Sequence, residues 1–100
     1  MMTKAQRDLN EMPIIDALRL DGNVVHPVSD ANGHPDLLVW CWRLKRLRLL
    51  EVKNPALPLT ARHLTDKQVK FFQRFGSAVE AGDVVKVESI EEALAAVGFT

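Results

Sequence analysis

Two apolar runs that are close together in the sequence constrain the fold most strongly: DLLVWCW over residues 36–42 and RLRLLEVK over residues 46–53. Both are rich in residues that favour a pleated surface, so they predict an antiparallel hairpin that turns at Leu44 and Lys45. At the end far from the turn, the runs carry three charged residues, Asp36, Glu51 and Lys53. Charges are rare on buried strands, so these three residues need a partner or a function.

Alternation along the two predicted strands brings the three charged side chains onto one face of the hairpin. A turn at residues 44 and 45 pairs Asp36 with Lys53 and Leu38 with Glu51. The diagonal distance between Asp36 and Glu51 is then about 7 to 8 Å, which is short enough for both carboxylates to contact one cation. The spacing of these residues is therefore compatible with a cation-binding site.

Two carboxylates on a partly buried surface need a positive charge between them. Lys53 is one source of that charge. A magnesium ion is the other, because it accepts one or two carboxylates and a carbonyl and often bridges to phosphate oxygens. A plainer interpretation stays open, in which Asp36, Glu51 and Lys53 all lie at a solvated margin of the sheet.

The remaining patterns predict helices and strands around this hairpin. Apolar residues at helical spacing predict a first helix over residues 10–21, with Asn10 as its cap and Pro13 in its first turn. The chain from Thr65 to Gln68 has the form of a capping box and predicts a second helix over about 65–75. Further elements follow from similar signals: a strand within 22–28, a loop over 29–35, an irregular loop over 54–63, a strand over 83–88, and a final helix that begins after Ser89 and ends at Gly98.

The predicted order is α, β, β, β, α, β, α. It describes one α/β domain over residues 1–100, with a mixed sheet flanked by helices. No apolar stretch approaches the roughly 18 residues of a membrane span. The polar start of the sequence has no apolar signal core, and Cys41 has no partner for an internal disulfide, so we expect a cytoplasmic protein.

The formal net charge is zero and the sequence pI is about 6.8, so no overall field attracts nucleic acid. The basic residues are nevertheless clustered, and residues 78–95 hold five acids against one lysine. Six basic residues are candidate nucleic-acid contacts: Arg43, Lys45, Arg46, Arg48, Lys67 and Lys70. The alternative is a solvated turn and a solvated helix face.

Two tryptophans, Trp40 and Trp42, share the face of Asp36 in the predicted strand. They either stack on bases or cover a helix or a subunit contact, as large aromatic residues usually do.

The motifs Pro35-Asp36 and Glu51-Val52-Lys53, separated by fourteen residues, resemble the signature of the PD-(D/E)XK, or restriction-endonuclease-like, nuclease superfamily. More narrowly, the chain resembles the VRR-NUC (virus-type replication-repair nuclease) family in its stand-alone phage and prophage form. The resemblance covers residues 8–98 and includes GHPDLLV, LLEVKNP, KQVKFF and VVKVESIEEAL in the same order.

The resemblance implies a restriction-endonuclease-like fold and a metal-dependent DNA endonuclease. Asp36, Glu51 and the carbonyl of Val52 would hold Mg²⁺ or Mn²⁺, Lys53 would orient or deprotonate the attacking water, and Gln68 would match a glutamine of the family. It also implies hydrolysis to a 5′-phosphate and a 3′-hydroxyl, branched DNA such as a Holliday junction as substrate, a homodimer, and a bacterial or phage-infected cytoplasm. Gln68 has a second explanation as a member of the capping box.

The chain departs from the family in the first helix, where the usual glutamate aligns with Pro13. Glu11 and Asp16 are the alternatives. A two-residue shift on a helix rotates a side chain by about 200°, so Asp16 points more nearly in the required direction. If neither replaces the glutamate, the chain is a non-catalytic nucleic-acid-binding or assembly module that keeps the nuclease fold.

Overall fold

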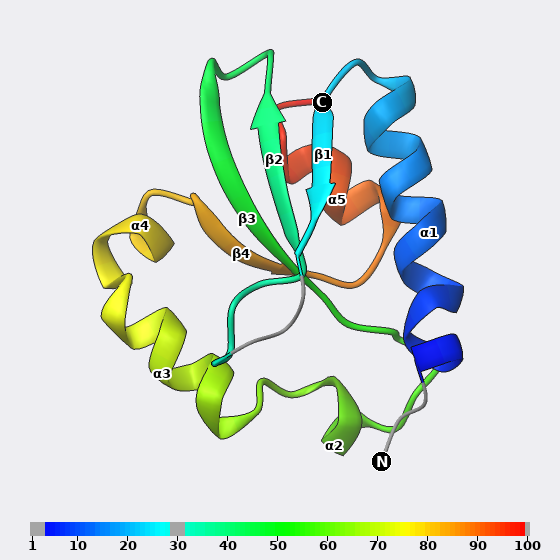
Figure 1. Ribbon diagram of the computed structural model, residues 1–100, viewed down its shortest axis with the longest axis vertical. Helices are drawn as coiled ribbons and strands as arrows, with labels where there is room; N and C mark the ends of the chain where they lie inside the picture. The colour runs from blue at the N-terminus through cyan, green and yellow to red at the C-terminus, as the bar shows by residue number, and fades with distance from the viewer. Residues whose placement is uncertain (1–3, 29–31, 100) are drawn as a thin grey trace.

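The computed structural model describes residues 4–28 and 32–99 and shows an α/β arrangement. Four strands form one mixed sheet in the order β1-β2-β3-β4, with β1, β2 and β3 antiparallel and β4 parallel to β3 (Figure 1). The elements are α1 (Lys4–Leu20), β1 (Val24–Pro27), β2 (Leu37–Cys41), β3 (Arg46–Val52), α2 (Leu59–Arg62), α3 (Asp66–Arg74), α4 (Gly76–Glu80), β4 (Val84–Val87) and α5 (Ile90–Ala96). The sheet flanked by helices confirms the predicted α/β class.

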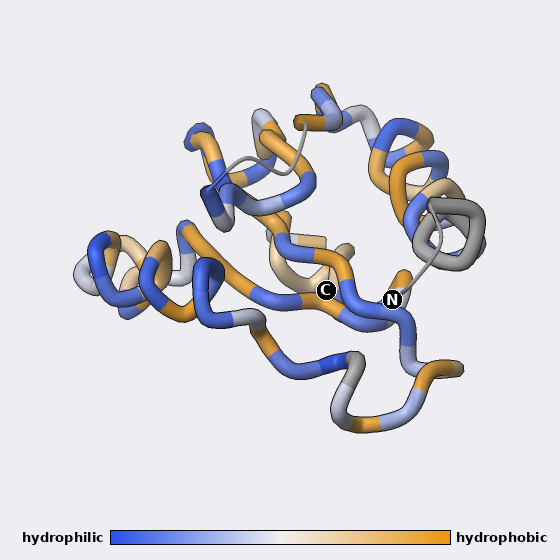
Figure 2. Tube along the Cα trace, turned by 60° about the horizontal axis from the view of Figure 1, so that its bottom comes forward, coloured by the Kyte–Doolittle hydropathy of each residue, from blue (hydrophilic) through white to orange (hydrophobic). Residues whose placement is uncertain are grey.

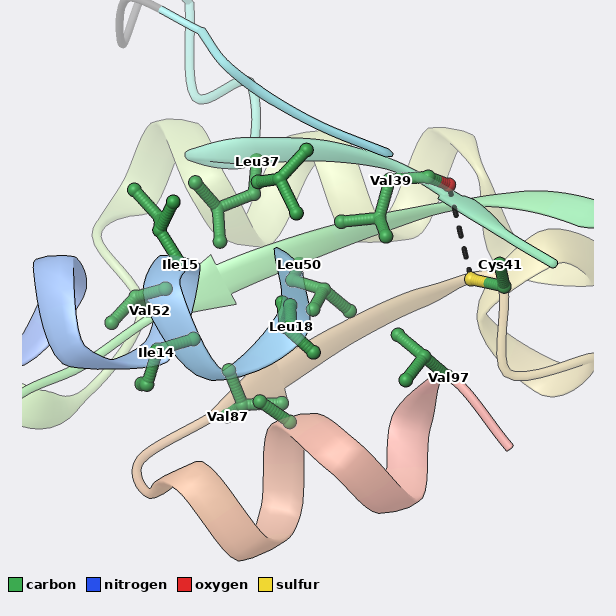
Figure 3. Packing of buried hydrophobic residues seen from close by; sticks show 12 residues of the cluster. Ile14, Ile15, Leu18, Leu37, Val39, Cys41, Leu50, Val52, Val87 and Val97 are labelled. Atoms are coloured by element: carbon green, nitrogen blue, oxygen red, sulfur yellow. Dashed lines mark hydrogen bonds between the residues drawn. The ribbon is translucent and has the colours of Figure 1, made fainter. Parts of the chain in front are cut away.

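The core lies between one face of the sheet and the helices α1 and α5 (Figure 3). Alternate residues of β2 point into it, since Leu37, Val39 and Cys41 are buried whereas Trp40 is exposed. The helices alternate between hydrophobic and hydrophilic residues, as expected of helices with one buried side (Figure 2). No helix in the described part of the chain is long and apolar enough to cross a membrane.

Helix α1 corrects the prediction for the first helix. It begins at Lys4, six residues before the predicted start, and Pro13 lies in its interior. A proline there costs about 3 kcal/mol, whereas each fully buried Ile or Leu contributes about 1.5 to 3 kcal/mol. Packing of Ile14, Ile15 and Leu18 therefore outweighs the proline, which is on the exposed side.

The connection from β3 to β4 contains three helices where one was predicted. The predicted helix over 65–75 is α3, and its capping box between Thr65 and Gln68 is present. The irregular loop predicted over 54–63 contains α2, which starts directly after Pro58. Proline is well tolerated at a helix start, because the helix does not use its missing amide there.

The hairpin turn is longer than predicted. The ladder pairs Leu37 with Leu50 and Cys41 with Arg46, which leaves residues 42–45 as a four-residue turn rather than a two-residue turn at 44 and 45. Lys45 has a φ of 57°, a left-handed conformation that the sequence did not reveal. The register moves by two residues, and because side chains alternate with a period of two, every residue keeps its predicted face.

Candidate functional site

Asp36 and Glu51 lie opposite each other at the end of the β2–β3 ladder. The last ladder pair is Leu37 with Leu50, so the next position along both chains brings Asp36 against Glu51. The side chains lie on the face away from the core and are only 2% and 1% exposed. The predicted shared face is confirmed, but the diagonal arrangement and the pairing of Asp36 with Lys53 are wrong because the turn is longer.

The carboxylate of Asp36 is held by the backbone of β3. Its Oδ2 accepts a hydrogen bond of 2.8 Å from the Val52 amide. In a strand, the amide and the carbonyl of one residue face the same neighbour, so the Val52 carbonyl also faces the side of Asp36. The Asp36 carboxylate and the Val52 carbonyl therefore lie on the same side of β3, and Glu51 is opposite Asp36 where β2 begins and β3 ends.

Lys53 is buried beside Glu51 and contacts helix α3. Its Nζ lies 3.7 Å from Glu51 Oε2 and donates a hydrogen bond of 2.8 Å to Gln68 Oε1. Only 6% of the lysine is exposed. The charged groups therefore do not lie at a solvated margin, and that plainer interpretation is wrong.

Gln68 forms the predicted capping box and also contacts Lys53. Its Oε1 accepts the Thr65 amide at 2.8 Å as part of the capping box, and the same oxygen accepts the Lys53 ammonium. The helix cap and the buried lysine therefore share one acceptor.

The turn before β2 packs directly on α3. A Cβ added at Gly33 would lie 2.2 Å from the Lys67 carbonyl oxygen, and Gly33 has a φ of 78°. The His34 ring packs edge-on against Phe71, with 5.4 Å between ring centroids. Only glycine suits this close approach, which positions α3, and with it Gln68, next to the segment that leads through Asp36 into β2.

Helix α1 approaches the site through Asn10, which sequence reasoning treated as a helix cap. Its Nδ2 donates a hydrogen bond of 2.8 Å to the Lys53 carbonyl. Asn10 therefore ties the helix to the end of β3. Asn10 lies in the middle of α1 rather than at its start, so the sequence carried no signal for this contact.

The two alternative first-helix ligands, Glu11 and Asp16, differ in their exposure to solvent. Glu11 precedes the buried residues Ile15 and Leu18 by four and seven positions, which places it on the same side of the helix, and it is half-buried. Asp16 is exposed to solvent. Within residues 4–28 and 32–99, however, no three acidic, histidine or cysteine side chains are grouped to hold a metal ion, so Glu11 does not complete such a group with Asp36 and Glu51.

The basic residues of the hairpin lie away from the candidate site. Arg46 and Arg48 pair with Cys41 and Val39 in the ladder, which places them on the opposite face from Asp36. Both contact the Asp83 carboxylate, at 2.6 and 3.2 Å. Their contact with nucleic acid stays a prediction, and it concerns a different surface.

The remaining candidate contacts are divided between the two ends of the sheet. Arg43 contacts Asp21 at 2.6 Å, and this hydrogen bond holds the pKa of the Asp21 carboxyl below its usual value. Lys45 is exposed in the hairpin turn. Lys67 and Lys70 are exposed on α3, the helix that holds Gln68. Among the predicted contacts, these two lysines are on the helix that contacts Lys53 through Gln68.

Sequence reasoning gave no role to Lys86, which the structure places beside the site. Lys86 pairs with Glu51 in the parallel β3–β4 ladder. Parallel strands are joined by a long crossover, so their register has no local signal in the sequence.

The chain matches no family model, no curated protein and no solved structure.

Proposed function

We propose that the protein is a Mg²⁺- or Mn²⁺-dependent nuclease of the restriction-endonuclease-like, VRR-NUC type that hydrolyses phosphodiester bonds in DNA. The observation that supports this most directly is the buried group of Asp36, Glu51 and Lys53 at the joined ends of β2 and β3. The motif that suggested the family from sequence corresponds to one compact set of side chains.

A purely structural role explains this group poorly. Removing a charge from water costs several kcal/mol even after the protein relaxes, and apolar residues of similar size often stabilise a protein as well or better. The three side chains together carry a formal charge of −1, because one lysine faces two carboxylates. A divalent cation suits such a set.

The donor atoms match the preferences of magnesium. Asp36 and Glu51 would provide carboxylate oxygens, and Val52 would provide its carbonyl oxygen, which are the hard ligands that Mg²⁺ accepts together with water and phosphate. When bound, the ion supplies a water of lowered pKa and neutralises charge on the phosphate. Asp36 is already oriented for this role, because the Val52 amide fixes one of its oxygens.

Lys53 would act on the attacking water. Gln68 holds the lysine Nζ in place, so the ammonium can orient the water or, after losing its own proton, accept one. The water oxygen would then bond to phosphorus while the water gives up a proton, and the bond from phosphorus to the 3′ oxygen would break. The leaving 3′ oxygen would take up a proton from solvent. The products are a 5′-phosphate and a 3′-hydroxyl.

The exposed face of the sheet supports the expected homodimer. Val24, Trp40 and Leu47 pair in register across three strands and are 63%, 39% and 56% exposed. Apolar residues in such a row are typical of an interface, and we propose a second copy of this chain as the partner. Two sites related by symmetry suit a branched DNA such as a Holliday junction.

The test is cleavage of labelled branched, single-stranded and duplex DNAs in the presence of Mg²⁺, Mn²⁺ or a chelator. We expect cleavage with either metal, none with chelator, and none after Asp36→Asn. Cleavage in the chelator would contradict the mechanism.

One observation favours a second candidate, a non-catalytic DNA-binding or assembly module. Pro13 occupies the position of the family's first-helix glutamate, and the described residues gather only two acids at the site. This candidate predicts DNA binding with no calorimetric response to Mg²⁺, whereas the nuclease predicts Mg²⁺ binding that Asp36→Asn abolishes.

A further inference from the structure

Lys86 completes a row of charged residues across three strands. The ladder between β3 and β4 pairs it with Glu51, and Asp36 follows Glu51 on the other side at the end of the β2–β3 ladder. Residues paired across neighbouring strands point to the same face of a sheet. Lys86 therefore shares the face of the two buried acids.

The ammonium of Lys86 is accessible where the acids are not. Lys86 is exposed, whereas its ladder partner Glu51 is 1% exposed. Among the residues that the structure describes, none forms a hydrogen bond or an ion pair with the Lys86 side chain. Strand β4 is also one of the two edge strands of the sheet, so in the described part of the chain no further strand pairs with it beyond Lys86.

The surrounding sequence makes a positive charge at this position unusual. Residues 78–95 contain five acids, and Lys86 is the single basic residue among them. The acids Asp36 and Glu51 repel DNA, because each phosphate also carries a negative charge. A lysine beside them offsets that repulsion on the solvent side.

We infer that Lys86 binds a DNA phosphate adjacent to the scissile one and so positions the substrate strand across the ends of β2, β3 and β4. This inference rests on the proposed nuclease function. Lys86 contacts the substrate away from the reacting atoms, so its loss weakens substrate binding and leaves the chemical step unchanged.

A different role for this residue predicts different behaviour. Lysines on outer strands also prevent sheets from pairing edge to edge. In that role, the loss of Lys86 causes self-association without a change in DNA binding.

The experiment compares the wild-type protein with Lys86→Met, Lys86→Arg and Arg19→Gln. Arg19 is exposed in the last turn of α1, at the opposite end of that helix from Asn10 and the candidate site, and glutamine keeps a donor for the Val25 carbonyl. Binding of a labelled four-way DNA junction is measured in chelator over a range of salt concentrations, and cleavage is measured separately with Mg²⁺. Light scattering and the melting temperature report on self-association and folding.

We expect Lys86→Met to reduce the slope of log affinity against log salt by about 0.9, the contribution of one phosphate contact. KM for cleavage rises about tenfold, as the loss of one charge-assisted contact predicts, and kcat is unchanged. Lys86→Arg retains the wild-type slope and KM, and so does Arg19→Gln.

Two results would overturn the inference. One is an equal change of slope in Lys86→Met and Arg19→Gln, which shows a general effect of charge. The other is self-association of Lys86→Met with a wild-type slope. If the wild-type protein binds the junction and does not cleave it, the proposed catalysis fails, while the slopes still decide the role of Lys86.

Discussion

The ammonium of Lys53 lies 2.8 Å from Gln68 Oε1, the same oxygen that closes the capping box of α3 through the Thr65 amide. Gln68 is 3% exposed, so water does not replace either hydrogen bond easily. The helix start and the proposed catalytic lysine are thus coupled through one side chain. Substitutions at Thr65 and Gln68 can distinguish the contribution of Gln68 to the helix cap from its contribution to the position of Lys53.

Gln68→Met is expected to lower both stability and cleavage. It removes one half of the capping box and leaves the buried Lys53 ammonium without this acceptor, and an unsatisfied buried polar group costs about 1 to 3 kcal/mol or more. Thr65→Val is the matched control, because it removes the other half of the box, worth about 1 kcal/mol, and leaves the bond between Gln68 and Lys53. Urea unfolding and cleavage rates are measured for both. Equal loss of cleavage in the two variants would show that Gln68 acts only as a helix cap.

Gly33→Ala is expected to destabilise the fold and to disturb the site. The new Cβ would lie 2.2 Å from the Lys67 carbonyl oxygen at a φ of 78°, so α3 must move. Gly76→Ala is the control, since a Cβ there meets no atom within 4 Å and alanine favours a helix by about 0.5 to 1 kcal/mol. Thermal unfolding should show a lower melting temperature for Gly33→Ala and an equal or higher one for Gly76→Ala. An unchanged melting temperature for Gly33→Ala would contradict the close packing.

The sequence was sufficient to predict the faces of the hairpin, and the structure shows why. Apolar alternation in β2 fixes which side of the strand meets the core, and a register error of two residues does not alter that side. Asp36 and Glu51 were therefore predicted on one face even though the turn length was wrong. The predicted turn was too short because Lys45 has a left-handed φ of 57°. Glycine or asparagine usually signals that conformation in a sequence, and neither is present here.

The long-range contacts of the site could not be predicted from the sequence. Asn10 is 43 residues from the Lys53 carbonyl that it contacts, and Lys86 meets Glu51 through a parallel ladder. Neither contact leaves a periodic pattern, because each depends on how separate elements pack. The family resemblance predicted Gln68 as a site residue, and the capping pattern predicted it as part of the helix cap. That one oxygen of Gln68 accepts both hydrogen bonds could be learned only from the structure.

The pair of Asp21 and Arg43 is expected to contribute to stability in a pH-dependent way. The hydrogen bond from Arg43 lowers the pKa of the folded Asp21 carboxyl. The contribution is therefore fully present above the unfolded pKa of about 3.9 and is lost as the pH falls through the lowered folded value. Urea midpoints from pH 7 to pH 2 should fall less steeply at the acid end for Asp21→Asn than for the wild type. If the urea midpoints of the two proteins fall equally steeply at acid pH, the pair of Asp21 and Arg43 contributes nothing to stability.

The exposed apolar row predicts how dimerisation depends on Trp40. Trp40→Ser removes the central member of the row formed with Val24 and Leu47, so the proposed dimer should dissociate at a higher protein concentration than the wild type does. Leu20→Ser is the control, because Leu20 is 91% exposed on α1 and lies outside that row. Sedimentation velocity over a range of concentrations measures both. A wild-type dimer that Trp40→Ser leaves intact would place the interface elsewhere.

Lys53 gives the sharpest separation between metal binding and catalysis. Its ammonium lies 3.7 Å from Glu51 Oε2, so it repels a cation from the same carboxylate. Lys53→Met should bind Mg²⁺ more tightly than the wild type and should not cleave DNA, whereas Asp36→Asn should lose both properties because it removes a ligand. Calorimetric titration with Mg²⁺ measures the first property, and cleavage of labelled DNA measures the second. Weaker Mg²⁺ binding in Lys53→Met would mean that the lysine supports the ligand geometry rather than competing with the ion, and retained cleavage would exclude it from the reaction.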